Sequence, residues 1–204
     1  MYKLYDYRPS GNGYKIRLLL TQLGIPYEYI EKNIIQRETR TPEFLAINPN
    51  GRIPVLELEP QVYLAESNAI LIYLSENTKF LPEDRLERAY VMQWLFFEQY
   101  SHEPNIATAR FILSYLQQGD EYRETLEKKR ELGYAALGVM EQRLQNHPFL
   151  VSDRYTIADI ALYAYTHVAD EGGFSLEDFP AIRSWIDRVQ TQPNHLKITQ
   201  AHRE

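Results

Sequence analysis

Residues 48–54 read Asn-Pro-Asn-Gly-Arg-Ile-Pro, and the apolar run Val55-Leu56-Glu57-Leu58 follows directly. We therefore expect a strand over residues 52–58 that has a proline close to its start. Proline cannot donate a hydrogen bond to a sheet, so Pro54 indicates a special backbone, such as a cis Ile53–Pro54 peptide bond. A backbone of that kind would turn the N–H and C=O groups of Ile53 toward a ligand.

On both sides of this stretch, short apolar runs alternate with turn signals. The expected strands and helices are 3–7, 13–24, 27–31, 52–58, 62–64 and 69–74. Two strands that are joined through a helix should lie parallel, and the tight turn at Pro60 makes the last pair antiparallel. The order βαβ, an irregular segment and ββα therefore predicts a mixed four-stranded sheet with flanking helices.

The remainder of the chain has a helical pattern. The helices that we expect there are about 85–117, 122–146, 157–172 and 180–192. The change in pattern predicts an α/β domain at 1–77, a linker at 78–84 and an all-helical domain at 85–204. A length of 204 residues is enough for two small domains.

The composition excludes several classes of protein. The chain has no cysteine, so disulfides, a cysteine nucleophile and thiolate metal sites are ruled out. Its five histidines have no metal-ligand spacing, and we expect neither a metal nor a permanently bound cofactor. A net charge of −6 disfavours nucleic-acid binding. The longest apolar runs are too short for a transmembrane helix and the first residues do not read as a signal peptide, so we expect a cytoplasmic protein without a membrane partner.

The negative charge comes from residues 81–204, because residues 1–80 carry equal numbers of acidic and basic side chains. The basic residues in that first part are either solvated surface charges or a local site for a small anion. Those considered for such a site are Arg8, Lys15, Arg17, Lys32, Arg37, Arg40 and Arg52.

Two further motifs lie at expected helix starts. Glu66-Ser67 precedes the apolar run 69–74 and is either a simple cap or a site for a carboxylate and an ammonium group, because a helix N-terminus attracts anions. Thr156-Ile157-Ala158-Asp159 has the spacing of a capping box before an apolar helix, and we interpret it as structural.

Together these motifs resemble the cytosolic glutathione S-transferases, over nearly the whole chain. The segment Ser10–Arg17 is similar to the serine-type bacterial, theta-like and zeta-like branches, and Trp94–Phe111 is similar to bacterial members. The resemblance implies a thioredoxin-like domain at 1–77 that binds glutathione. It also implies an all-helical domain at 85–204 that binds an electrophile.

The resemblance also implies roles for individual residues. Ser10 would stabilise the glutathione thiolate, and Tyr5, Tyr7 and Asn12 are the alternatives. Ile53, beside Pro54, would bind the cysteinyl backbone through its main chain, while Glu66 and Ser67 would hold the γ-glutamyl ammonium and carboxylate groups. A cation is needed for the glycine carboxylate, and the residues considered are Arg52 first, then Lys32, Gln36, Arg37 and Arg40.

The family resemblance places the electrophile pocket between the domains and implies a homodimer. The residues considered for the pocket lining are Arg8, Pro9, Arg110, Phe111 and Tyr115. The expected function is the conjugation of glutathione, as a co-substrate, to hydrophobic electrophiles in detoxification. The alternatives are a zeta-like glutathione-dependent isomerase and a non-catalytic interaction module. The absence of cysteine argues against the thiol-transferase and dehydroascorbate-reducing branches.

Overall fold

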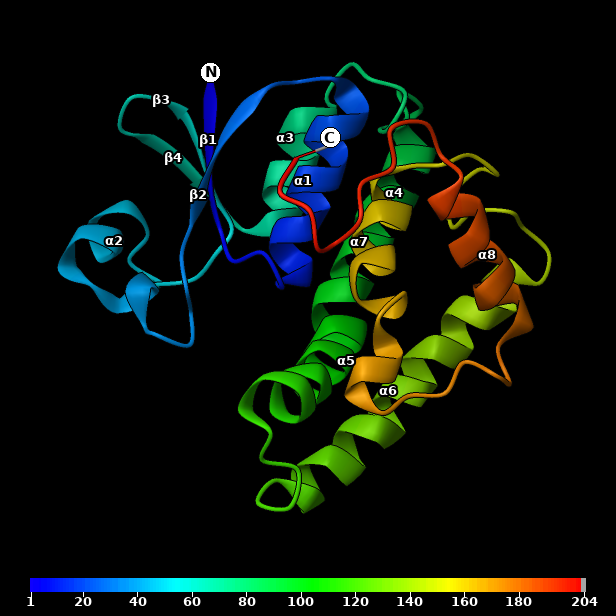
Figure 1. Ribbon diagram of the computed structural model, residues 1–204. Coiled ribbons are helices and arrows are strands. Elements are labelled where there is room, and N and C mark those ends of the chain that lie inside the picture. The colour runs from blue at the N-terminus through cyan, green and yellow to red at the C-terminus, as the bar shows by residue number, and fades with distance from the viewer. Residues whose placement is uncertain (203–204) are drawn as a thin grey trace. The chain divides into compact units, whose positions relative to one another are not determined.

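A four-stranded mixed sheet organises the N-terminal part of the protein (Figure 1). The computed structural model describes residues 1–202. The sheet order is β2-β1-β3-β4, and the strands are β1 (Tyr2–Asp6), β2 (Tyr27–Glu31), β3 (Val55–Glu59) and β4 (Val62–Ala65). β1 pairs parallel with β2 and antiparallel with β3, and β3 pairs antiparallel with β4. The expected α/β class and mixed sheet are confirmed.

Two longer helices accompany the sheet. They are α1 (Gly11–Leu23) and α3 (Ser67–Ser75). Both contribute fully buried apolar side chains, as do β1 and β3. Members of this core are Leu4, Ile16, Leu19, Leu20, Val55, Leu56, Ile70 and Leu71. The segment that we expected to be irregular holds a 3₁₀ turn (Glu38–Arg40) and the short helix α2 (Pro42–Ile47), which Thr41 caps.

The second part is helical, as expected. Its α-helices are α4 (Arg85–Phe97), α5 (Glu103–Arg110), α6 (Arg123–Leu144), α7 (Ile157–Thr166) and α8 (Pro180–Gln190). The expected helix 85–117 contains two π-helical stretches, at Glu98–His102 and Phe111–Leu116. A 3₁₀ turn (Ala169–Gly172) follows α7. The capping box at Thr156 and Asp159 is confirmed, and the fully buried Trp185 donates from its indole Nε1 to Asp159 Oδ1 at 3.0 Å.

The chain forms two compact units whose limits differ from the expected domains. Unit 1 comprises Met1–Glu76 and the described residues from Pro193 onward, whereas unit 2 comprises Asn77–Gln192. The expected linker belongs to unit 2, since Phe80 and Leu81 are buried and the Phe80 carbonyl accepts from Ile157 N at 3.0 Å. The last segment, which we expected in the helical domain, belongs to unit 1, where side chains of α1 and β2 bind its backbone carbonyls.

Candidate functional site

The register of the sheet brings three motifs of unit 1 to the same end of its strands: the Ser10 loop, the Ile53–Pro54 segment and Glu66-Ser67. Tyr5 pairs with Val55, and Val55 pairs in turn with Ala65. The loop 7–10 therefore leaves the sheet where the Ile53–Pro54 segment enters it and where the chain turns into α3. Segments that are far apart in the sequence thus form one site because the strands between them are paired.

Ser10 lies between β1 and α1 and caps that helix. Its backbone is extended (φ −70°, ψ 127°), and its Oγ accepts from Gly13 N at 3.4 Å. The Ser10 amide donates to the Tyr7 carbonyl at 2.7 Å, which closes the loop 7–10. A hydroxyl that accepts a hydrogen bond still has its own proton to donate. Ser10 can therefore donate to an anion at the N-terminus of α1.

Asn12, Lys15 and Ser67 form a polar cluster between α1 and α3. Lys15 Nζ donates to Asn12 Oδ1 at 2.8 Å and to Ser67 Oγ at 3.2 Å. Ser67 Oγ also donates to Asn12 Oδ1 at 3.2 Å. Lys15 is fully buried and Ser67 is 4% exposed. The cluster places a cation and a hydroxyl at the N-terminus of α3, which is the arrangement that a carboxylate needs.

Glu66 precedes this cluster with an unusual backbone. Its φ is 70° and its ψ is 113°, a conformation that residues with a Cβ rarely adopt. Such positions persist only where the surrounding structure fixes them, and they cluster at functional sites. The exposed Glu66 side chain therefore stands at a fixed point beside Ser67.

The Ile53–Pro54 peptide bond is cis, as the sequence predicts. The loop before it is held by Asn48, whose Nδ2 donates to Arg52 O at 2.9 Å and whose Oδ1 accepts from Asn50 N at 3.1 Å. Asn48 is buried, so it orders the motif from within.

The basic residues that we considered for an anion site are divided by burial. Lys15 and Arg17 are fully buried, and Lys32 is half-buried. The others, with Gln36, are exposed: Arg8, Arg37, Arg40 and Arg52. Arg40 Nη1 donates to the Asn50 carbonyl at 3.0 Å, which ties it to the loop that carries Arg52. Arg52 and Gln36 remain a prediction as ligands of the glycine carboxylate.

The hydroxyl of Tyr5 is already engaged. It donates to Glu57 Oε2 at 3.0 Å, and burial together with Glu57 raises the pKa of Tyr5 to about 12. Burial also raises the pKa of Tyr7. This geometry favours Ser10 over Tyr5 as the donor to a thiolate.

The residues considered for the electrophile pocket come from both units. In unit 1, the loop 7–10 contains Pro9 and Arg8, and the Arg8 amide donates to Glu31 Oε1 at 3.2 Å. In unit 2, Arg110 is buried and its Nε donates to Glu171 Oε2 at 2.8 Å. Its guanidinium lies 5.2 Å from the centre of the Tyr115 ring.

Phe111 stacks on that same ring, with 6.2 Å between the centroids of Phe111 and Tyr115. A role for any of these residues in binding an electrophile remains a prediction.

Sequence reasoning assigned no specific role to four residues that order the site: Asp6, Lys15, Arg17 and Asn48. For Lys15 and Arg17 a signal was present, because two basic residues stand inside the otherwise apolar run 14–20 of α1. Asp6 gave no comparable signal. Its carboxylate is fully buried and pairs with Arg17 Nε at 2.9 Å.

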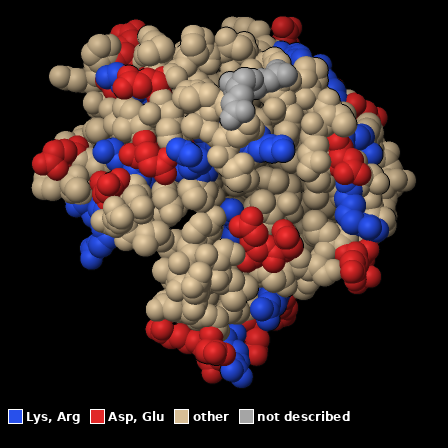
Figure 2. All heavy atoms as spheres, viewed as in Figure 1, with Lys and Arg blue, Asp and Glu red and all other residues tan. Residues whose placement is uncertain are grey.

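Charge and metal-binding groups give little further information on function. On the face shown in Figure 2, Lys and Arg side chains are interspersed with Asp and Glu side chains. Within residues 1–202, no cluster of histidine and acidic side chains could hold a metal ion. In the same part of the chain, no helix is both long and apolar enough to span a bilayer.

Comparison with known proteins links both parts of the chain to one family. The family model of the glutathione S-transferase N-terminal domain matches residues 1–76, and that of the C-terminal domain matches residues 94–193. The disulfide-bond oxidoreductase YfcG of Escherichia coli K12 is 32% identical over 200 residues, which cover 95% of this chain and 92% of that protein.

Two solved structures from Pseudomonas fluorescens Pf-5 are similar in fold and sequence. A glutathione S-transferase is 54% identical with a TM-score of 0.96, over 98% of this chain and 99% of the other. A glutathione transferase family member with two glutathione bound is 28% identical with a TM-score of 0.82, over 95% of this chain and 89% of the other.

Proposed function

The chain belongs to the glutathione S-transferase family, and on that premise we propose that it binds glutathione in unit 1 and transfers its thiolate to hydrophobic electrophiles. The observation that carries the proposal is the cluster of Asn12, Lys15 and Ser67 at the same end of the sheet as the Ser10 loop. A tripeptide with a carboxylate at one end and a thiol in its middle fits that combination.

The thiol would be activated without a metal or a general base. A free thiol has a pKa of about 8.5, and lowering it by about two units requires about 2.7 kcal/mol in favour of the thiolate. A hydrogen bond from the Ser10 hydroxyl to a charged sulfur contributes about 1.5–3 kcal/mol. The N-terminus of α1, which Ser10 caps, adds about 0.3–1 kcal/mol. Together these contributions amount to about 1.8–4 kcal/mol, a range that includes the required free energy.

The remaining contacts follow the shape of the site. Ser67 and Lys15 would bind the γ-glutamyl carboxylate, and Glu66 would bind the ammonium group on the same carbon. Ile53 would hydrogen-bond the cysteinyl backbone through its main chain, and Arg52 would bind the glycine carboxylate. An arginine can hold a carboxylate through two parallel hydrogen bonds.

Calorimetric titration with glutathione, followed by S-hexylglutathione, tests this proposal. We expect both to bind and the hexyl derivative to bind more tightly, because the alkyl group adds buried apolar surface. Failure of both ligands to bind at millimolar concentrations would refute a glutathione site. The protein would then be better described as a non-catalytic interaction module.

Disulfide reduction is a second candidate, which the similarity to YfcG favours. A chain without cysteine could catalyse it only through glutathione itself. One glutathione thiolate would attack the disulfide and expel a thiolate. A second would attack the glutathione sulfur of the resulting mixed disulfide, which gives glutathione disulfide and releases the other substrate thiolate. An assay with bis(2-hydroxyethyl) disulfide separates the two activities. An enzyme that only conjugates glutathione would reduce this disulfide no faster than the background rate.

We also propose a cytoplasmic homodimer with a role in detoxification. Support for a dimer comes from apolar side chains exposed on unit 2, including Phe96 (74%) and Tyr100 (87%). A groove of about 530 Å³ lies beside Tyr100 and is lined by apolar residues of α5 and α6 that include Pro104, Leu132 and Val139. Light scattering during gel filtration would report twice the monomer mass if the proposal is right.

A further inference from the structure

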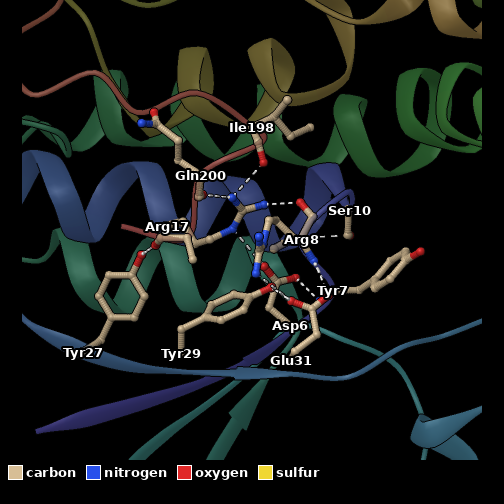
Figure 3. Close-up of polar contacts among 12 residues, drawn as sticks. Asp6, Tyr7, Arg8, Ser10, Arg17, Tyr27, Tyr29, Glu31, Ile198 and Gln200 are labelled. Carbon is tan, nitrogen blue, oxygen red and sulfur yellow. Dashed lines mark hydrogen bonds and ion pairs between the residues drawn. The ribbon is translucent and has the colours of Figure 1, made fainter. Parts of the chain in front are cut away.

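Arg17 links three segments of unit 1 through one guanidinium group (Figure 3). They are α1, which carries Arg17, the end of β1 with the loop after it, and the C-terminal segment. Its Nε donates to Asp6 Oδ2 at 2.9 Å, and its Nη2 donates to the Arg8 carbonyl. Its Nη1 donates to the carbonyls of Ile198, at 2.9 Å, and Gln200. The Arg17 side chain is fully buried, so each of these oxygens replaces water that the charge would otherwise require.

The first connection is to the loop 7–10. Asp6 Oδ1 accepts from Tyr7 N at 2.7 Å, and Arg17 holds the carbonyl of Arg8. Asp6 and Arg17 thus fix the two residues after β1 through their backbone. Because the Ser10 amide binds the Tyr7 carbonyl, the position of Ser10 depends on this pair.

The second connection is to residues 196–201, which we name the strap. Figure 1 shows the C-terminal segment beside α1. The Tyr14 hydroxyl donates to the Leu196 carbonyl at 2.6 Å, and the Tyr27 hydroxyl donates to the Ala201 carbonyl. The strap is therefore held through its backbone carbonyls, at both ends and, by Arg17, in its middle.

We infer that Asp6 and Arg17 are positioning residues for Ser10, and that the strap is the third part of the same hydrogen-bonded unit. The part played in the reaction rests on the proposed function of Ser10. A guanidinium is planar and cannot reorient one donor without moving the others. If the strap carbonyls move away, buried N–H groups lose their acceptors, and Arg17 must shift and release the Arg8 carbonyl. Disorder in the strap is thereby transmitted to the Ser10 loop.

The variant Thr199→Pro tests this coupling from the strap side. Thr199 is exposed and lies between the two residues whose carbonyls bind Arg17, in a turn closed by Gln200 N donating to Lys197 O at 3.0 Å. Proline at 199 restricts Ile198 to extended backbone and disfavours the turn, so it moves both carbonyls and removes no buried side chain. Thr199→Ala is the matched control, since it removes only the exposed side chain.

Hydrogen exchange in the absence of glutathione gives the first readout. In Thr199→Pro we expect the amides of Tyr7 and Ser10 to exchange at least about tenfold faster, together with those of the strap. In Thr199→Ala both regions should keep the wild-type rates. Faster exchange in the strap of Thr199→Pro with an unchanged loop would overturn the inference.

The pKa of glutathione bound to the enzyme, measured from thiolate absorbance, gives the second readout. We expect Thr199→Pro to raise it toward the value of about 8.5 for a free thiol, and Thr199→Ala to leave it unchanged. A merely structural role would lower the stability of the protein without moving this pKa in the folded enzyme. An unchanged pKa in Thr199→Pro would therefore remove the positioning role.

Arg17→Lys gives the same test from the other side, in case Thr199→Pro does not fold. Lysine keeps a positive charge opposite Asp6 but has no planar fork to reach four oxygens. Loop and strap should then lose protection together, and loss in the strap alone would contradict the inference. Because exchange needs no ligand, failure of the wild type to bind glutathione would refute the proposed function separately.

Discussion

Lys15 and Arg17 are two positions apart on α1, and both are fully buried. Residues with that spacing do not share a helix face, so the two charges reach different neighbours. Arg17 is paired with the Asp6 carboxylate and holds backbone, whereas Lys15 lies beside the Ser67 hydroxyl at the start of α3. One helix therefore supplies a cation that holds the backbone of the Ser10 loop and a cation placed for a ligand.

The variant Lys15→Met should weaken glutathione binding about 10- to 100-fold. Methionine has a similar volume but no charge, so a hydrogen bond to a carboxylate worth about 1.5–3 kcal/mol is lost. Calorimetry with S-hexylglutathione measures the effect. The matched ligand is S-hexyl-cysteinylglycine, which has no γ-glutamyl group and should bind both proteins equally. Equal loss for both ligands would show that Lys15 does not contact that group.

The variant Ser10→Ala should lower kcat/KM for conjugation about 10- to 100-fold, as expected for the loss of about 1.4–3 kcal/mol of thiolate stabilisation. The pKa of the bound thiol should rise in parallel. Tyr5→Phe is the control, because the Tyr5 hydroxyl is engaged with Glu57 and its loss should leave the rate nearly unchanged. A Ser10→Ala rate within twofold of wild type would shift the role to Asn12 or Tyr7.

At the scale of elements, α1 packs against the end of β1 at Gly13. A Cβ atom at Gly13 would lie 1.5 Å from Asp6 Oδ1, so no side chain fits there unless Asp6 moves. Gly13→Ala should therefore break the buried pair of Asp6 and Arg17, at a cost of about 3–5 kcal/mol in the stability of unit 1. Urea unfolding, monitored by hydrogen exchange in α1, measures this loss of stability.

Gly138→Ala provides the comparison for that variant. Apart from its chain neighbours and the adjacent backbone of α6, no atom of the described residues lies within 4 Å of a Cβ placed at Gly138. Alanine has the higher helix propensity, so this change should be neutral or stabilising by up to about 1 kcal/mol. A Gly13→Ala protein as stable as Gly138→Ala would show that Asp6 can move freely.

The elements that periodicity predicts are those whose local pattern matches their packing. β2 is found at Tyr27–Glu31 as expected. α1 begins at Gly11, two residues before the expected start, because Ser10 caps it. The π-helical stretches and α2 were not predicted. A π-stretch adds no distinctive residue pattern to an amphipathic helix, and α2 is too short at six residues for periodicity to be visible.

The site was predictable only where a motif marks it. Asn48–Pro54 and Glu66-Ser67 could be identified, and the strand pairing brings them to the same end of the sheet. The strap could not be found in this way. Its contacts use backbone carbonyls, which every residue has, and the donors lie more than 170 positions away along the chain. Burial of Arg17 and Tyr14, which decides those contacts, is a property of the folded unit.

At the scale of the molecule, the two compact units can be observed separately. Both tryptophans of the chain, Trp94 and Trp185, belong to unit 2. Trp185 is fully buried and donates to Asp159, a fully buried carboxylate that also accepts from Leu150 N at 3.0 Å and Thr156 N at 2.9 Å. Tryptophan fluorescence therefore follows the unfolding of unit 2 and the environment of Asp159.

The stability of unit 2 should depend on the protonation of Asp159. Burial raises the pKa of Asp159 to about 6, against an ordinary value of 3.8, although its hydrogen bonds oppose this rise. The folded state therefore holds a proton that the unfolded chain has released between these two values. The resulting stabilisation is complete below pH 3.8 and is lost as the pH rises through about 6. From about pH 5 to about pH 7.5 the loss from this group is about 1.4 kcal/mol.

Urea unfolding at about pH 5 and about pH 7.5, monitored by tryptophan fluorescence, measures this loss of stability. Asp159→Asn is the matched variant, because asparagine does not titrate, and its own pH dependence contains the contributions of all the other groups. It should be less stable overall, since an amide N–H would face the donors that Asp159 accepts from. The free energy of unfolding of the wild type should nevertheless fall more steeply with pH than that of the variant. If the two fall in parallel, Asp159 is ionised throughout this range, and its hydrogen bonds outweigh its burial.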